Sequence, residues 1–247
     1  MSIKTKAKPL IFILVVALII FGLWFVLIKN RQESTNSSNS SQSNFDKTLY
    51  SLTEPSSLWV IVNKKQPLPQ AYEPSPLVAP DVGLRTKNTD PEMKLRDDAA
   101  VAVESLVSGA KKAGNELIVV SGFRSYQAQS SVYNSAVRQD GQAEADKYSA
   151  RPGHSEHQTG LAVDFGLPDR SCELEVCFAE TKAGTWLADH AHEYGFVLRY
   201  DKDKQSSVGY DYEPWHFRFV GNELAAEVKK TGQTLEEYFG LPPAPSY

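Results

Sequence analysis

Cysteine is scarce in this sequence, with Cys172 and Cys177 the two present among 247 residues. So few cysteines exclude a small scaffold held together by several disulfides. A zinc site built on these thiolates would need two more ligands close by. In an extracytoplasmic protein a pair with this short spacing is more often a local disulfide, and the alternative is two free, partly buried thiols.

Positive charge is also limited. Lysine and arginine number 26 against 30 aspartate and glutamate residues, which gives a formal net charge of -4 with the basic N-terminus included. The sequence has neither a basic patch nor aromatic residues interleaved with basic ones, so no nucleic-acid partner is expected. It also lacks an internal repeat, which excludes a solenoid of stacked units.

Charge is entirely absent from residues 9–28, "PLIFILVVALIIFGLWFVLI". This run is long enough for a helix across a hydrocarbon layer of roughly 30 Å, and it lacks the polar face that a buried soluble helix would have. A cleaved signal peptide would have a shorter apolar run followed by small residues, which "KNRQESTNSS" does not provide. We therefore expect a transmembrane anchor over residues 9–28.

The charges beside this run indicate its orientation. Three lysines lie within residues 1–8, whereas Lys29 and Arg31 follow the run with Glu33 nearby. The positive-inside rule therefore favours residues 1–8 in the cytoplasm and the remainder of the chain outside it. We expect a single-pass protein of the cell membrane whose large domain is extracytoplasmic.

The rest of the chain divides into a linker and a domain. Residues 32–44, "QESTNSSNSSQSN", carry no apolar side chain to bury, so residues 29–50 are expected to form a flexible Ser/Asn-rich linker. Residues 51–247, roughly 200 in number, suffice for one domain with a substantial core. We expect this domain to be a monomer.

Hydrophobic periodicity within the domain predicts an α+β fold. Helices are expected where apolar residues recur at helical spacing, at residues 93–113, 125–141, 182–194 and 222–240. Strands are expected in short apolar or alternating runs, at residues 58–62, 116–122, 161–165, 196–200 and 216–220. The last strands are too close in sequence for helical crossovers, which predicts a small antiparallel sheet with helices on one side.

The segment "RPGHSEHQTGLAVDFG", residues 151–166, carries the first candidate site residues. Alternation along the strand places Val163 and Phe165 on an apolar face and Asp164 on the other, among small residues. A half-buried carboxylate is costly without a partner, so Asp164 needs a cation, a cluster of N–H groups or a metal ion. His157 precedes the strand, and a turn can bring its ring back toward Asp164.

The segment "YEPWHFRFV", residues 212–220, carries the second set. In a strand, His216 shares one face with Arg218, whereas Phe217 faces the core. Pro214 argues against a helix here, and in an extended chain Glu213 and His216 would point to opposite faces. The two side chains can converge only if the backbone bends near Pro214 and Trp215, and we predict this bend.

Two imidazoles and one carboxylate form a recurrent zinc shell with an open fourth position. We therefore predict that His157, Asp164 and His216 bind the metal and that Glu213 is the general base, because zinc brings the pKa of its water to about 7. The alternative from spacing alone is a hydrogen-bonded core histidine and a salt-bridged aspartate.

Four linked motifs, "SGFRSYQAQ", "RPGHSEHQTGLAVDF", "WLADHAHEYGFVLRY" and "YEPWHFRF", resemble in order and spacing the VanY-type D-alanyl-D-alanine carboxypeptidases, especially their LdcB/DacB-like members. The resemblance covers about residues 58–240. It implies a VanY-type peptidase domain over 51–247, on the fold shared with lysostaphin-type and hedgehog domains. It also implies a zinc enzyme that removes the terminal D-alanine from peptidoglycan stem peptides, with the family's ligands at His157, Asp164 and His216 and its catalytic glutamate at Glu213.

The same resemblance implies roles for four more residues. Arg124 of "SGFRS" would be catalytic and substrate-binding, since its guanidinium can hold a peptide carboxylate or a developing oxyanion. Gln129 and Ser155 would form hydrogen bonds to the substrate, and Tyr126 would line the pocket. The alternative for Arg124 is a surface salt bridge.

His154 departs from the pattern of the family, where an aromatic residue is frequent. We interpret it as a residue of the pocket wall, because His157 occupies the motif position and three ligands suffice. Two other functions remain as alternatives to removal of D-alanine from a pentapeptide. One is a different cut in the same substrate class, by L,D-carboxypeptidase or endopeptidase action, and the other is a non-catalytic wall-binding module on the same fold.

Overall fold

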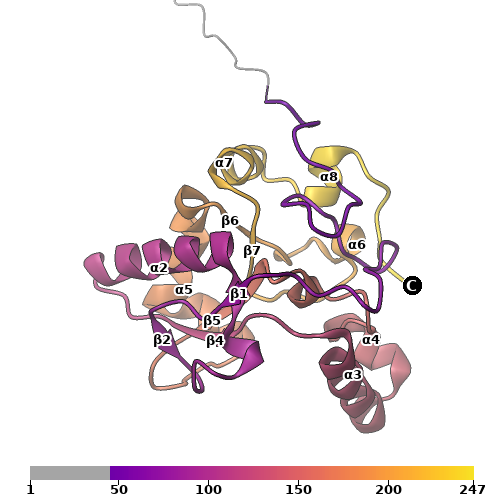
Figure 1. The fold of residues 1–247 in the computed structure, drawn as a ribbon, viewed down its shortest axis with the longest axis horizontal. Coiled ribbons are helices and arrows are strands. Elements are labelled where there is room, and N and C mark those ends of the chain that lie inside the picture. Colours follow the sequence, from indigo (N-terminus) through magenta and orange to yellow (C-terminus); the bar gives the residue numbers. More distant parts are fainter. Residues whose placement is uncertain (1–44) are drawn as a thin grey trace, which may run out of the picture. The chain divides into compact units, whose positions relative to one another are not determined.

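A five-stranded mixed sheet organises residues 45–247, the part of the chain that the computed structural model describes (Figure 1). Its strands, in spatial order, are β2 (Gly83–Leu84), β4 (Ile118–Ser121), β5 (Ala162–Gly166), β7 (His216–Phe219) and β6 (Phe196–Leu198). β2 is parallel to β4, and the other neighbours are antiparallel. The α+β class is confirmed, but the prediction of a purely antiparallel sheet is wrong, because a helix between β2 and β4 supplies the crossover that parallel strands need.

That crossover helix, α2 (Asp97–Lys112), follows a small antiparallel pair, β1 (Leu77–Val78) with β3 (Leu95–Arg96). The helix expected from residue 93 therefore begins four residues later. The residues just before α2 form other elements instead, namely a 3₁₀ helix, Pro91–Met93, and the strand β3.

The loop after β4 explains this late start. The N–H groups of Gly122 and Phe123 donate to the carbonyls of Glu92 and Lys94, at 2.5 and 2.7 Å, so these carbonyls are not available to a helix. The approach is close enough that a Cβ on Gly122 would lie 2.4 Å from the Lys94 oxygen. Glycine is therefore required where this loop meets the segment before α2.

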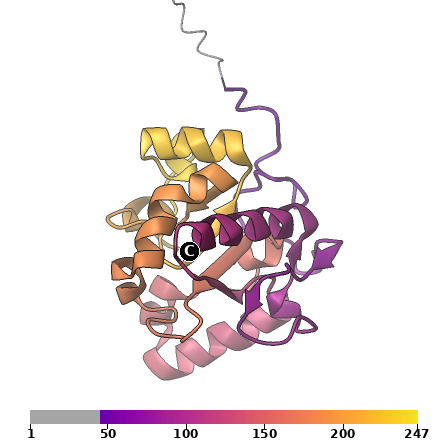
Figure 2. The ribbon, with the colours of Figure 1, turned by 90° about the vertical axis from the view of Figure 1, so that its left-hand side faces the viewer.

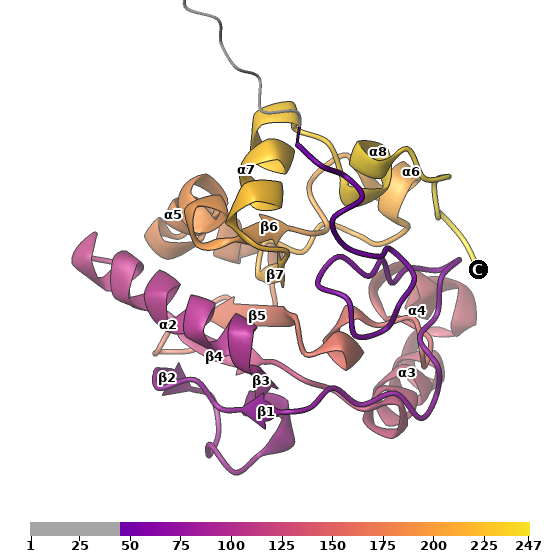
Figure 3. The ribbon, with the colours of Figure 1, turned by 45° about the horizontal axis from the view of Figure 1, so that its top comes forward.

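The remaining helices fall near the predicted positions. They are α3 (Tyr126–Asp140), α4 (Gln142–Tyr148), α5 (Lys182–His190), α6 (Gln205–Val208), α7 (Asn222–Thr231) and α8 (Leu235–Phe239), with 3₁₀ helices at Glu156–Thr159, Val176–Glu180 and Ala191–Tyr194. In Figure 3, α2 and α5 lie toward one end of β5, and α3 and α4 lie beyond its opposite end. The short helices α4 and α6 were not predicted.

The main core lies between one face of the sheet and the helices α2 and α5 (Figure 2). Val163, Phe165 and Phe217 are buried there, as strand alternation predicts. The Phe165 ring meets the Phe217 ring edge to face with centroids 5.8 Å apart. This packing fixes β5 against β7 and leaves the opposite face of both strands for polar side chains.

The strand predicted at residues 58–62 is wrong, although Val60 and Val62 are buried there. The carbonyls of Leu58 and Val60 accept hydrogen bonds from the Arg218 guanidinium at 3.0 and 2.9 Å. A side chain of β7 thus satisfies backbone groups that a neighbouring strand would otherwise pair with.

The predicted anchor at residues 9–28, the cytoplasmic segment 1–8 and most of the linker lie outside the described residues. Within residues 45–247, no helix has the length and apolar character needed to cross a bilayer. At the end of the linker, Lys47 donates to the Tyr238 carbonyl and the Tyr50 ring lies 5.0 Å from that of Trp59. The last linker residues therefore pack on the domain.

Candidate metal and catalytic site

The pairing of β5 with β7 places two candidate ligands side by side. Asp164 and His216 are direct partners in this antiparallel register, on the face opposite Phe165 and Phe217. The Nδ1 atom of His216 lies 3.0 Å from Oδ1 of Asp164. Both side chains are buried, so the pair is isolated from bulk water.

His157 reaches the same point from the 3₁₀ helix Glu156–Thr159. Its Nδ1 donates to the Gly122 carbonyl at 2.6 Å, which assigns the ring proton to Nδ1. Nε2 is then left with a free lone pair, 3.2 Å from Oδ2 of Asp164. His157, Asp164 and His216 are the His/Asp/Glu/Cys group found within the described residues whose ligand atoms all lie within 4.8 Å of one another.

The predicted bend before β7 is present. Pro214 and Trp215 form a turn in which the His216 N–H donates to the Glu213 carbonyl at 3.1 Å. This turn brings Oε2 of Glu213 to 3.7 Å from Nδ1 of His216. Glu213 therefore faces the three candidate ligands, as a general base beside a metal ion must.

The donor set fits a divalent metal ion with an affinity for nitrogen. Two imidazole nitrogens and a carboxylate, with a further carboxylate nearby, are typical of a three-ligand catalytic zinc site. Burial lowers the pKa of His157, so that ring stays neutral, the form that coordinates a metal. Burial acts in the opposite direction on Asp164, but His157 and His216 outweigh it and hold the pKa of that carboxyl below its usual range.

Without a metal ion, the other two groups hold protons. Burial raises the pKa of Glu213 to about 8, with the Asp164 charge adding to the effect and His216 opposing it. Burial alone would lower the pKa of His216, but its hydrogen bond with Asp164 and the nearby carboxylate of Glu156 raise it to about 9. A cation among these groups would displace the His216 proton and favour ionised Glu213.

These residues form the floor of a cavity of about 470 Å³. The cavity is surrounded by side chains from α3, α4, the loop after β6 and the turn before β7. Its lining residues include Arg124, Gln129, Ser155, Tyr200, Tyr210, Tyr212 and Trp215. A cavity of this size accommodates the end of a peptide.

Arg124 follows β4 and lines this cavity, and its Nε also forms an ion pair with Oε1 of Glu92 at 4.0 Å. One guanidinium nitrogen donates to Oε1 of Gln129 at 3.0 Å and another to Oγ of Ser121 at 2.9 Å. Its Nε is buried without a hydrogen-bond partner. The side chain is thus held by two neighbours and keeps a donor for a ligand.

The three residues expected to contact substrate lie in different places. Gln129 and Ser155 line the cavity, but both are buried, and Gln129 already bonds Arg124 and the Ala150 carbonyl. Tyr126, the first residue of α3, does not line the cavity, because its ring lies against Gly153. Gln129 is therefore placed to orient Arg124.

His154 is not part of the cavity wall, contrary to the interpretation from sequence. Its Nδ1 lies 2.8 Å from the Asn63 carbonyl, and its ring meets that of Tyr247 edge to face. The ring serves instead to join the segment before His157 to the C-terminus.

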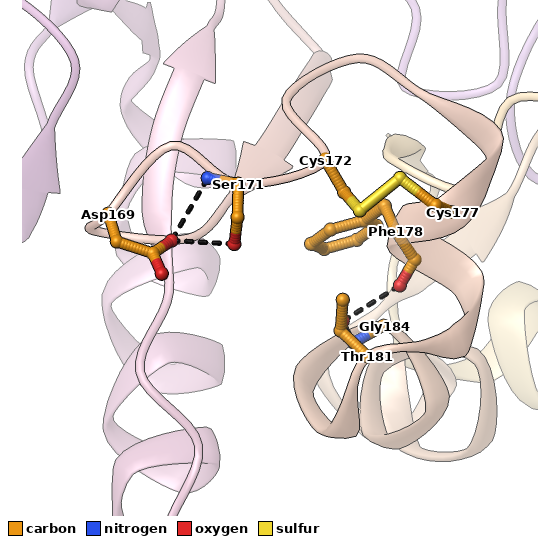
Figure 4. The surroundings of a disulfide bond; sticks show 7 residues. All are labelled: Asp169, Ser171, Cys172, Cys177, Phe178, Thr181 and Gly184. Carbon is orange, nitrogen blue, oxygen red and sulfur yellow. Dashed lines mark hydrogen bonds between the residues drawn. A yellow bond between two sulfur atoms is a disulfide. The ribbon is translucent and has the colours of Figure 1, made fainter.

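Cys172 and Cys177 are joined by a disulfide (Figure 4). Cys172 packs against the main core, and Phe178, next to Cys177, is fully buried. Two residues inside the closed segment, Leu174 and Val176, line the cavity. The disulfide thus closes a loop that belongs to the site.

Sequence reasoning missed the buried charges behind the ligands. Glu156 accepts hydrogen bonds from Arg199 at 2.8 Å and Arg218 at 2.9 Å, and all three are buried. Tyr200 lies with its ring 4.7 Å from that of His216. The arginines are 43 and 62 residues from Glu156 in sequence, so the signal available was only that Arg218 shares a face with His216.

Fold and site together have the features of a metal-dependent hydrolase, namely a group that could hold a metal ion with a carboxylate beside it, and comparison with known proteins defines the family. Residues 92–222 match the family model described as VanY, D-alanyl-D-alanine carboxypeptidase. The chain belongs to the VanY family, which confirms the resemblance drawn from the motifs. A putative carboxypeptidase, YodJ, of Bacillus subtilis is 41% identical over 191 residues, which cover 77% of this chain and 70% of that protein.

Solved structures agree with this assignment. The structure of the LdcB LD-carboxypeptidase is similar with a TM-score of 0.72 and 42% identity, over 75% of this chain and 87% of that one. A mutant of the D,D-pentapeptidase VanY, solved in complex with Zn(II), is similar with a TM-score of 0.60 and 31% identity, over 75% of this chain and 99% of that one.

The raised pKa of Glu213 predicts how its replacement changes the pH dependence of stability. Between its ordinary pKa of 4.5 and the folded value of about 8, the folded protein keeps a proton that the unfolded chain releases. Stability of the metal-free protein therefore falls as pH rises through this window. Glu213→Gln removes this dependence, so its stability relative to the unmodified protein should increase from pH 5 to pH 8, measured by urea unfolding after chelation.

Glu223→Gln is the matched control, because Glu223 is exposed on α7. Its stability difference from the unmodified protein should not follow the same curve. Parallel curves for Glu213→Gln and the unmodified protein would show that Glu213 does not hold this proton.

Proposed function

We propose that this protein is a zinc-dependent carboxypeptidase that removes the C-terminal D-alanine from peptidoglycan stem peptides. The observation that carries the proposal is the turn at Pro214, which places Glu213 beside the His157, Asp164 and His216 group in the same cavity as Arg124. The zinc complex of a VanY relative supports the choice of metal.

His157, Asp164 and His216 would hold the zinc ion, which when bound supplies a Lewis acid and lowers the pKa of water to about 7. Glu213 takes the proton of the attacking water as general base. Arg124, held by Gln129 and Ser121, donates to the carboxylate of the terminal residue or to the oxyanion formed at the scissile carbonyl. Protonated Glu213 then returns its proton to the amine of the departing D-alanine.

Burial of His157, Asp164 and His216, with Glu213 partly buried beside them, supports this division of roles. The floor of the cavity excludes most bulk water, which strengthens the interaction of Glu213 and Arg124 with the charges that form during reaction. A non-catalytic wall-binding module would not need a carboxylate beside the metal ligands. An endopeptidase would not need an arginine that can hold a terminal carboxylate.

Replacement of the base should separate catalysis from metal binding. Glu213→Ala should lower kcat by at least about 100-fold, the usual contribution of a general base, while zinc content stays near one per chain. His216→Ala should lose both zinc and activity, because it removes a ligand. Release of D-alanine and zinc content, measured on the same preparations, test this, and full activity of Glu213→Ala would refute the assignment of the base.

A second measurement distinguishes the two possible stem peptides. Two similar structures described as LD-carboxypeptidases are 42% and 40% identical to this chain, whereas the VanY structure is 31% identical. We therefore expect a higher kcat/KM for a tetrapeptide stem than for a pentapeptide stem. Mass spectrometry of muropeptides carrying both stems tests this, and preferential loss of the fifth residue would indicate D,D-carboxypeptidase action instead.

A further inference from the structure

Exposed apolar side chains gather at the opening of the cavity. Within the described residues, eight large hydrophobic side chains are exposed, namely Leu49, Tyr50, Val78, Val101, Val132, Tyr148, Leu174 and Val176. Four of these eight line this one cavity, namely Val132, Tyr148, Leu174 and Val176. Exposed apolar groups that cluster around a polar site are typical of a surface that binds a ligand. We call these four residues the apolar rim.

Half of the apolar rim belongs to the loop that the disulfide closes. Leu174 is 37% exposed and Val176 is 56% exposed. Cys172 and Leu174 have φ angles of 52° and 55°, a conformation that side chains other than glycine rarely adopt. The disulfide limits the conformations open to this short loop, so it helps to keep both apolar side chains at the cavity.

The position of the scissile bond shows which part of a substrate meets the apolar rim. Glu213 and the three ligands mark the bond to be cut, and Arg124 marks the carboxylate one residue beyond it. The peptide N-terminal to the bond must therefore leave the polar floor through the cavity opening. There it passes side chains that cannot hydrogen-bond but can cover aliphatic groups.

We propose that the apolar rim, with Leu174 and Val176 held by the Cys172–Cys177 disulfide, binds the aliphatic part of the stem peptide on the N-terminal side of the scissile bond, including the side chain of the residue before that bond. This inference rests on the proposed function and adds a recognition surface to it. In a tetrapeptide stem the residue before the scissile bond is the diamino acid, and its long aliphatic side chain is the occupant that we propose.

The experiment compares two substrates on three variants. Leu174→Ser combined with Val176→Ser should raise KM for a stem tetrapeptide by about tenfold, while kcat stays within about twofold. The reason is that the two apolar side chains would no longer be buried against the substrate when it binds. An N-acylated L-Ala-D-Ala dipeptide lacks the long aliphatic side chain, so the preference of the unmodified protein for the tetrapeptide should disappear in this variant. Cys172→Ser with Cys177→Ser should raise KM for the tetrapeptide in the same direction while zinc content is retained.

Val101→Ser is the matched control, since Val101 is 62% exposed on α2 and does not line the cavity. It should leave KM unchanged. If the unmodified protein hydrolyses the tetrapeptide but the rim variants keep its KM, the apolar rim does not bind substrate. If the unmodified protein hydrolyses no stem peptide, the proposed function itself fails.

A separate observation concerns Glu156, which lies directly behind the metal ligands. Its Oε1 accepts hydrogen bonds from both Arg199 and Arg218, whereas Oε2 is buried without a hydrogen-bond partner. Nε2 of His216 is also buried without one, and these two atoms face each other at 3.6 Å. Buried polar atoms left unpaired cost free energy, so a small approach of the two is favourable.

The carboxylate of Glu156 cannot turn freely. Arg199 is also held by both carboxylate oxygens of Glu236, at 2.9 and 2.6 Å, and Arg218 by three backbone carbonyls. Nδ1 of His216 points to Asp164 on the other side of the ring. An imidazole that binds a metal through Nδ1 carries its proton on Nε2, where it can donate to a carboxylate.

The geometry points to Glu156 as a positioning residue that holds the His216 ring with Nδ1 toward the metal. This role rests on the metal site of the proposed function, and titration of the unmodified protein with zinc tests that site separately. Glu156→Gln has a single acceptor oxygen for both the arginines and His216, so the dissociation constant for zinc, measured by competition with a chelator, should rise by about 10- to 100-fold.

Glu236→Gln is the matched control, because it also removes a carboxylate from Arg199 but does not contact His216. It should lower stability without changing zinc affinity. If Glu156→Gln and Glu236→Gln bind zinc with equal affinity, Glu156 has only a structural role. If Glu156→Gln does not fold, nitrogen NMR of histidine-labelled, zinc-loaded unmodified protein decides: a protonated Nε2 on His216 is expected, and an unprotonated Nε2 would overturn the assignment.

Discussion

The antiparallel register of β5 with β7 is the constraint on which the site depends. It makes Asp164 and His216 direct neighbours and, by strand alternation, sends Phe165 and Phe217 to the opposite face. A shift of one residue would place Asp164 of β5, or His216 and Arg218 of β7, in the apolar core. The aromatic packing on one face therefore holds the candidate metal ligands together on the other.

Burial of so many charges requires compensation, and the molecule provides it in two layers. At the cavity floor, His157 lies close to Asp164, and His216 lies close to Glu213. Burial raises the pKa of Glu213, so this carboxyl keeps its proton and leaves no isolated charge. Behind them, Glu156, Arg199, Arg218 and Glu236 form a closed set of ion pairs. Because removal of one partner from a buried pair leaves the other uncompensated, the second layer constrains the position of the first.

Local sequence pattern was sufficient for the parts of this design that depend on neighbours in the chain. Alternation in "GLAVDFG" and "HFRFV" indicated which side chains share a face, and Pro214 required the bend that brings Glu213 to His216. The motifs then identified the family. These features lie within a few residues of one another, so a single segment contains the information that determines them.

Features that depend on distant partners could not be predicted in this way. Residues 58–62 have the pattern of a strand, but Arg218, about 160 residues away, takes their carbonyls. Residues 93–96 have the pattern of a helix, but the loop at Gly122 and Phe123 takes the carbonyls of Glu92 and Lys94. Tyr126 and His154 were expected at the cavity and instead pack on Gly153 and Tyr247. In each case the local preference was correct in kind and was overridden by a hydrogen bond or ring contact formed across the fold.

The same distinction separates the chemistry of the site from its recognition surface. His157, Asp164 and His216 are fixed by the sheet and by the 3₁₀ helix that leads into it. The surrounding wall comes from α3, α4 and the loop after β5, none of which belongs to the sheet. A loop outside the sheet lacks ladder hydrogen bonds to order it, and in this chain the Cys172–Cys177 disulfide and the buried Phe178 fulfil that need. The wall can therefore differ among proteins that share these four candidate site residues without disturbing the register that holds them.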